Sequence, residues 1–93
     1  MGTEFTIRFE HPDPITVVSI LRRLPIVHQL SPNWREFELR APDTTDEMPD
    51  ASMTVETDGL YFCDYGGNGR EIFGRVIACL VGHFGPVKVE VRE

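Results

Sequence analysis

The chain has 93 residues, of which 41% are hydrophobic and 26% charged, fractions close to those of ordinary globular domains. This length predicts one domain spanning residues 1–93, and the composition excludes wholesale disorder. Fifteen acidic against nine basic residues give a net charge of −6, which argues against a nucleic-acid partner. No apolar run reaches the roughly 18 residues of a membrane span, and no leader pattern opens the chain. We therefore expect a cytoplasmic protein without a membrane partner.

The first 25 residues predict a strand followed by a helix. Residues 3–10 alternate between apolar and polar side chains, which is the period of a half-buried strand. Asp13 can cap a helix, and Pro14 suits the first helical position, where no N–H is needed. Apolar residues then recur at helical spacing until Pro25, so we expect a helix over about 14–24.

The next segment predicts a strand and then an acidic loop. Residues 26–30 form a short apolar run that we interpret as an extended lead-in, and the alternation over 34–40 predicts a strand. Residues 41–51 contain two prolines and no basic residue, so we expect a mobile loop that buries nothing. The acidic residues of this loop are Asp43, Asp46, Glu47 and Asp50.

A hairpin follows, with predicted strands at 52–57 and 60–65. The dipeptide Asp58-Gly59 between them is typical of a two-residue turn. Because directly opposed residues share a face, this turn predicts which side chains point the same way. The core side is expected to hold Met53, Val55, Leu60 and Phe62. The other side is expected to carry Thr54, Glu56, Tyr61, Cys63 and Tyr65.

The last third of the chain predicts a helix and a strand. The loop Gly66–Gly69 leads into a helix over 69–84, with Asn68 as its cap and Glu71 completing a capping box. A Gly-Pro pair ends this helix. Three valines that alternate with charged residues then predict a strand near 87–92.

The predicted order is therefore β-α-β-β-β-α-β, which is typical of a small α+β sandwich. Each helix has a single broad apolar stripe, so we expect both helices on one face of a mostly antiparallel sheet. By element order alone, the nearest template is a ferredoxin-like split βαβ arrangement with one extra strand.

Few residues indicate catalysis or metal binding. Cys63 and Cys79 lack the spacing of a zinc site, and both are predicted to be free thiols. The three histidines, His11, His28 and His83, share no motif spacing. We therefore predict no metal, no cofactor and no catalytic residue, and an enzyme is the less favoured hypothesis.

The glycine-rich loop supports an alternative hypothesis. Gly66, Gly67, Gly69 and Arg70 precede or open a helix, and a helix N-terminus favours anions. With His11, they could form a small-molecule or anion-binding domain, with catalysis as an extension of that hypothesis. A structural turn is favoured, because Asp64 would repel a phosphate and the loop matches no nucleotide-binding motif.

The preferred hypothesis concerns the sheet face opposite the helices. Tyr61 and Tyr65 are expected there, and Trp34 joins them if Phe37 and Leu39 face the helices. Tyrosine and tryptophan are enriched at binding hot spots. Aromatic side chains on an uncovered sheet face therefore favour an interaction surface.

We thus expect a small, acidic, non-enzymatic domain that binds another protein, such as an inhibitor, antitoxin or immunity protein that neutralises a basic partner. A homodimer that pairs two sheet faces is a further alternative. The expected binding residues are Trp34, Tyr61, Tyr65, Asp43, Asp46, Glu47 and Asp50.

Overall fold

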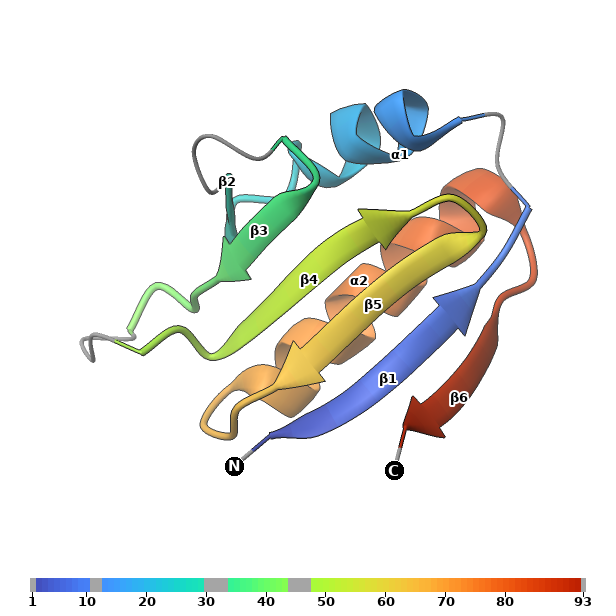
Figure 1. Ribbon diagram of the computed structural model, residues 1–93. Helices are drawn as coiled ribbons and strands as arrows, with labels where there is room; N and C mark the ends of the chain where they lie inside the picture. The colour runs from blue at the N-terminus through green and yellow to red at the C-terminus, as the bar shows by residue number, and fades with distance from the viewer. Residues whose placement is uncertain (1, 11–12, 30–33, 44–47, 93) are drawn as a thin grey trace.

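The computed structural model describes residues 2–10, 13–29, 34–43 and 48–92 (Figure 1). Two helices and six strands follow one another in the described chain. In order they are β1 (Thr3–Arg8), α1 (Pro14–Leu21), β2 (Val27–Gln29), β3 (Glu36–Leu39), β4 (Ala51–Glu56), β5 (Gly59–Asp64), α2 (Gly69–Phe84) and β6 (Lys88–Arg92).

All the strands belong to one sheet, in the order β2-β3-β4-β5-β1-β6, and every neighbouring pair is antiparallel. The strands β1 and β4 therefore run parallel on either side of β5, and β5 and β6 run parallel on either side of β1. The chain between β1 and β4 includes α1, and the chain between β5 and β6 forms α2. The predicted split βαβ arrangement is confirmed. Residues Val27–Gln29, predicted as an extended lead-in, form an additional strand that pairs with β3.

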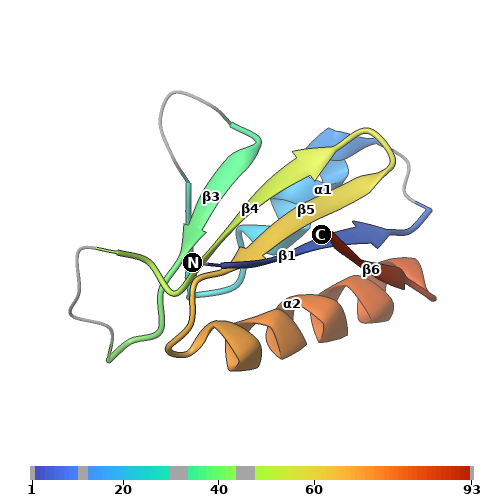
Figure 2. The same cartoon turned by 60° about the horizontal axis from the view of Figure 1, so that its bottom comes forward.

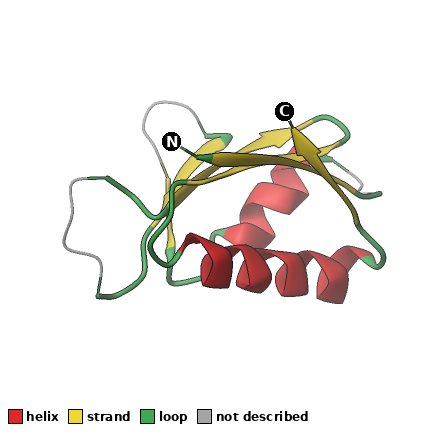
Figure 3. Cartoon of the chain, turned by 90° about the horizontal axis from the view of Figure 1, so that it is seen from below, coloured by secondary structure: helices red, strands yellow, loops and turns green. Residues whose placement is uncertain are grey.

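Both helices cover the same face of the sheet, as Figures 2 and 3 show from two directions. The helix α1 contacts β4, and α2 contacts β5. Between the two layers lies one core, formed by alternate strand residues and the apolar stripes of the helices. Its largest fully buried side chains are Phe37, Phe62, Ile7, Leu21, Leu39, Met53, Leu60, Ile72, Leu80, Val17, Val55 and Val76.

Aromatic rings attach α2 to the sheet. The ring of Phe73 on α2 lies 4.6 Å from that of Phe5 and 5.0 Å from that of Phe62, measured between centroids. At the other end of the helix, Phe84 lies 5.3 Å from Phe9. Such ring pairs add roughly 0.5–1.5 kcal/mol beyond the area they bury. They hold α2 under β1 and β5, and they leave the opposite face of the sheet uncovered.

The ends of the helices confirm one predicted cap and correct another. Asp13 caps α1, because its carboxylate accepts a hydrogen bond of 2.7 Å from the backbone N–H of Thr16. Asn68 makes no such bond at the start of α2, so the predicted capping box is wrong. Its side chain instead donates to Asp43 at 3.3 Å. The predicted glycine stop is confirmed, since Gly85 has φ 85° and its N–H bonds to the carbonyl of Val81.

The β4–β5 hairpin has the predicted faces but a different turn. Glu56 is opposite Gly59, so the two turn residues are Thr57 and Asp58, and the register is shifted by two residues from the predicted one. A shift of two preserves the faces, because the side-chain period of a strand is two. Gly59 has no positive φ. It is needed for close approach, since a Cβ atom there would lie 2.0 Å from the carbonyl oxygen of Ile7 on β1.

Candidate functional site

The open face of the sheet, turned away from both helices, carries the alternate residues of five strands. Their neighbours in sequence, such as Ile7, Phe37 and Phe62, are buried between the sheet and the helices. Because successive residues of a strand point to opposite faces, these alternate residues lie on the open face. The described open-face residues are Glu36 and Glu38 from β3, Ser52, Thr54 and Glu56 from β4, Tyr61 and Cys63 from β5, Glu4, Thr6 and Arg8 from β1, and Lys88, Glu90 and Arg92 from β6.

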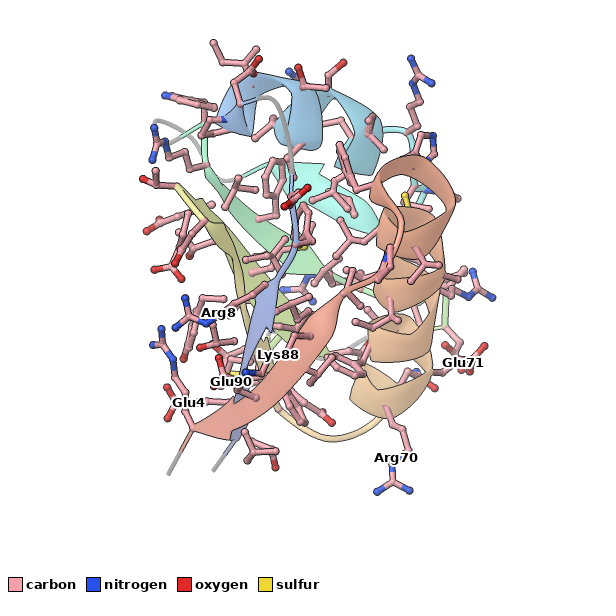
Figure 4. The ribbon with its side chains drawn as sticks, turned by 90° about the vertical axis from the view of Figure 1, so that its right-hand side faces the viewer. Glu4, Arg8, Arg70, Glu71, Lys88 and Glu90 are labelled. Atoms are coloured by element: carbon pink, nitrogen blue, oxygen red, sulfur yellow. The ribbon has the colours of Figure 1, made fainter. Side chains whose placement is uncertain are left out.

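One part of the open face is occupied by internal ion pairs. Arg8 lies 2.6 Å from both Glu90 and Asp58, and the labelled side chains in Figure 4 show Arg8 and Glu90 on the side of β1 and β6 away from α2. Arg92 lies 3.8 Å from Glu56 and donates to Thr6 at 2.6 Å. We call this part the paired half; it consists of Glu4, Thr6, Arg8, Glu56, Asp58, Tyr61, Glu90 and Arg92.

Tyr61 belongs to the paired half. Its hydroxyl donates to Glu4 at 2.5 Å, and the guanidinium of Arg92 lies 4.7 Å from the centroid of its ring. The hydrogen bond to Glu4, with some desolvation, raises the pKa of Tyr61 above the ordinary tyrosine value. Both the ring and the hydroxyl already have partners within the chain. Tyr61 therefore lies on the predicted face but is not a free anchor for a partner.

The rest of the open face is hollowed. A depression of about 340 Å³ lies over β3 and β4 and is bordered by Tyr65, which follows β5. Tyr65 is 37% exposed, with its hydroxyl 2.9 Å from Ser52 Oγ, and Met48 beside it is 60% exposed. Glu38 lies 3.5 Å from Arg40, whereas Glu36 forms no ion pair with any described residue. We call this part the hollowed half; it consists of Glu36, Glu38, Met48, Pro49, Ser52 and Tyr65.

The predicted acidic loop divides into residues with different roles. Asp50 is buried, and its carboxylate accepts hydrogen bonds from the backbone N–H groups of Ala41 at 2.9 Å and Asn68 at 3.4 Å. Its placement on an exposed binding surface is therefore wrong, because two separate segments bond to it. Asp43 is exposed. Asp46 and Glu47 lie outside the described residues.

Trp34 lies away from the open face. It is 39% exposed and borders a shallow hollow of about 350 Å³ with Ile15, Val18 and Arg22 of the α1 region. The guanidinium of Arg35 lies 4.8 Å from the centroid of its ring. Phe37 and Leu39 do face the helices, as assumed. Trp34 precedes β3 rather than continuing its alternation, so its expected place beside the two tyrosines is wrong.

The glycine loop is organised around carboxylates of the chain itself. The N–H of Gly66 donates to Asp64 at 2.8 Å, and the N–H of Asn68 donates to Asp50. A Cβ atom on Gly69 would lie 1.9 Å from the Asp64 carboxylate. Gly66 and Gly67 have φ values of 105° and 55°, which favour glycine.

These contacts argue against an anion site in the loop, because two carboxylates already bind its amides. Arg70 extends into solvent from the start of α2, as Figure 4 shows. The other residue of that hypothesis, His11, lies outside the described residues. The contacts of the loop with Asp64 and Asp50 thus favour a structural turn.

A cysteine and a histidine meet on α2 but do not form a reactive pair. Cys79 Sγ lies 3.9 Å from His83 Nδ1, and the same nitrogen lies 2.9 Å from the carbonyl oxygen of Cys79. A carbonyl oxygen only accepts hydrogen bonds, so Nδ1 carries the proton and cannot take one from the thiol. Partial burial also raises the pKa of Cys79. The pair therefore lacks the arrangement of an activated nucleophile.

Both cysteines are free thiols, as predicted, and they lie on opposite sides of the sheet. Cys63 is on the open face yet buried, because the segment at Gly2 lies over it; a Cβ atom on Gly2 would be 2.7 Å from its sulfur. Within the described ranges, no three potential metal-ligating side chains form a group. None of the described helices is long and apolar enough to cross a membrane.

The site differs from its prediction mainly in which residues are available. Of the expected aromatic anchors, only Tyr65 is both on the open face and exposed. Glu36 and Glu38, which were not among the expected binding residues, line the same depression. Met48 was missed, because a single methionine within an acidic segment carries no pattern. Comparison of the chain with family models, with curated proteins and with solved structures gives no match.

Proposed function

We propose that this chain is a non-enzymatic protein-binding domain whose hollowed half accepts a basic segment of another protein. The observation that carries the proposal is the combination of two exposed apolar side chains, Tyr65 and Met48, with two carboxylates, Glu36 and Glu38, around one depression. A flexible methionine and a tyrosine provide adaptable contact area at such surfaces.

The charges of the hollowed half favour a basic partner. Only Glu38 has an ion-pair partner among the described residues of this half, so the local field is negative. The net charge of −6 extends this preference to the whole chain. Complementary charge accelerates encounter, and apolar contacts then slow dissociation. An inhibitor of a basic enzyme, such as an antitoxin or an immunity protein, would act in this way.

The test is to select binders from a displayed random peptide library on the immobilised protein. We expect enrichment of lysine and arginine beside an apolar residue. For a selected peptide, Glu36→Gln should slow association and flatten its salt dependence, because it removes an acid that has no ion-pair partner among the described residues. Met48→Ser should speed dissociation, because it removes exposed apolar contact area. Stopped-flow or biosensor kinetics measure both rates.

Matched controls exist elsewhere on the chain. Glu71→Gln removes an exposed acid from α2, and Ile15→Ser removes an exposed apolar side chain from α1, where Ile15 is 69% exposed. Neither should change binding. Selection of neutral or acidic peptides, or equal effects of test and control variants, would contradict the proposed surface.

A further inference from the structure

The two edges of the sheet are unequal. At one edge β2 has three residues, and at the other β6 has five, Lys88–Arg92. On the side of β6 away from β1, no described strand follows. An edge strand of this kind presents unpaired backbone N–H and C=O groups to any other strand that can align with it.

The helix-side surface of β6 is apolar and uncovered. Val89 and Val91 are opposite Ile7 and Phe5 of β1, so they point toward the helix layer. They are nevertheless 42% and 61% exposed, because α2 packs against β5, two strands away. Figure 4 shows β6 in front, with α2 to one side of it. A strand added beyond β6 would cover these valines.

The alternation of β6 identifies a suitable partner strand. We propose that a second copy of this chain pairs with β6 in an antiparallel manner, about a two-fold axis at Val89. In this register Val89 is opposite its own copy, Lys88 is opposite Glu90, and Val87 is opposite Val91. The helix side of the new pair is then wholly apolar, and both charged pairs on the open-face side are attractive.

Other registers fit less well. An axis at Glu90 would oppose Glu90 with itself and Lys88 with Arg92, which places like charges together. An axis at Val91 would oppose Glu90 with Arg92, and both are already paired within their own chain, Glu90 with Arg8 and Arg92 with Thr6 and Glu56. An axis at Val89 also uses Glu90, but it pairs Glu90 with Lys88 instead of Arg92. Lys88 is exposed and belongs to none of the ion pairs among the described residues. The axis at Val89 gives this lysine a carboxylate partner.

Such a dimer extends the sheet without closing the open face. Directly opposed residues share a face, so the helices of both copies lie on one side and both open faces on the other. The two hollowed halves lie at the far ends of the joined sheet, beyond β5 in each copy. The inference therefore does not depend on the proposed function.

Sedimentation of the full chain over a range of concentrations tests the proposal. A single strand pair is a small interface, so association is expected at roughly 10 µM to 1 mM. The mass should rise from 10.6 kDa toward twice that value. Val89→Lys should keep the chain monomeric, because two lysines would meet at the axis. The matched control is Val81→Lys on α2, where Val81 is 46% exposed, and it should dimerise like the wild type.

Charge exchange tests the register. Lys88→Glu and Glu90→Lys should each weaken dimerisation about tenfold, since each converts two attractive pairs into repulsive ones. An equimolar mixture of the two variants should form a heterodimer of wild-type affinity. Circular dichroism of each variant establishes that it is folded, which matters for Glu90→Lys because Glu90 also binds Arg8. The variant Lys88→Glu/Glu90→Lys restores both pairs within one sequence and should dimerise again.

A monomer at every concentration overturns the proposal and leaves this edge to a strand of a different protein. A dimer that survives Val89→Lys overturns it as well, because the interface then lies elsewhere. Failure of both the mixture and the double variant to restore association overturns the register.

Discussion

The paired half and the hollowed half share one sheet face but differ in how their charged groups are used. On the paired half, arginines of β1 and β6 lie within 4 Å of carboxylates from β4, β6 and the turn at Asp58. On the hollowed half, two carboxylates and two apolar side chains border a depression, with one arginine partner for Glu38. The charged groups of the paired half contact one another, whereas the hollowed half retains side chains that can contact a partner.

The chain's two tyrosines illustrate the difference. Tyr61 is held between Glu4 and Arg92, whereas Tyr65 makes one hydroxyl contact with Ser52 and keeps its ring exposed. Both were expected on the same face from the same alternation. Position on a face therefore does not decide whether an aromatic side chain can bind a partner; its contacts within the chain decide it.

The largest expected effect comes from Asp50, which directly follows Met48 and Pro49 of the hollowed half. Asp50→Ala leaves the N–H groups of Ala41 and Asn68 without their carboxylate partner in a partly buried site. We expect the free energy of unfolding to fall by about 2–3 kcal/mol. Binding of a selected basic peptide should weaken too, because Met48 and Pro49 immediately precede this residue. Urea denaturation and calorimetry measure the two effects.

Asp43→Ala is the control for that loss, since Asp43 is an exposed acid of the same loop that accepts one long hydrogen bond, 3.3 Å, from the Asn68 side chain. Its effect on unfolding should stay within about 0.5 kcal/mol. An unchanged free energy of unfolding in Asp50→Ala would show that Asp50 is not a structural link between the loop and α2.

The second effect separates the two tyrosines directly. Tyr65→Ala should weaken peptide binding by about 2 kcal/mol, the usual threshold of a hot spot, with folding retained. Tyr61→Ala should leave the affinity unchanged and lower the free energy of unfolding by about 1 kcal/mol, because its contacts are internal. Titration calorimetry and thermal melts of both variants give the comparison. If Tyr61→Ala weakens binding and Tyr65→Ala does not, the roles of the two halves are reversed.

Much of the fold could be predicted because its signals are local and periodic. Alternation of period two located β1, β3 and β6, and the apolar stripe with its Gly-Pro stop located α2 over 69–84. The predicted faces of the hairpin are correct although the predicted turn is not, because a register shift of two residues leaves every side chain on the same face. The role of Gly59 depends on contact with β1, which is distant in sequence, so no local pattern reveals it.

The candidate site was harder to predict, because it depends on pairings between strands that are far apart in the sequence. The contact of Tyr61 with Glu4 joins residues 57 positions apart, and that of Arg8 with Glu90 joins residues 82 apart. The sequence shows that the segment 41–51 is rich in acidic residues, but it does not show that Asp50 is buried and bound to the backbone of Ala41 and Asn68. Trp34 was misplaced because alternation was extended beyond the first residue of β3, Glu36.

The smallest expected effect is a titration that reports on the paired half alone. The hydrogen bond to Glu4 raises the pKa of Tyr61, so the folded chain retains this proton above pH 10, where an unfolded chain loses it. The stabilisation from this group is therefore complete below pH 10 and decreases as the pH rises above it. Ultraviolet titration of the phenolate should show a high-pH component that Tyr61→Phe removes. Glu4→Gln should move that component to lower pH, because an uncharged amide replaces the carboxylate that accepts the hydrogen bond of the Tyr61 hydroxyl. Glu36→Gln on the hollowed half should leave the component in place. An identical titration in the wild type and Glu4→Gln would show that Glu4 does not bind the Tyr61 hydroxyl. The hydroxyl of Tyr61 would then be available to a partner, and the paired half would differ less from the hollowed half.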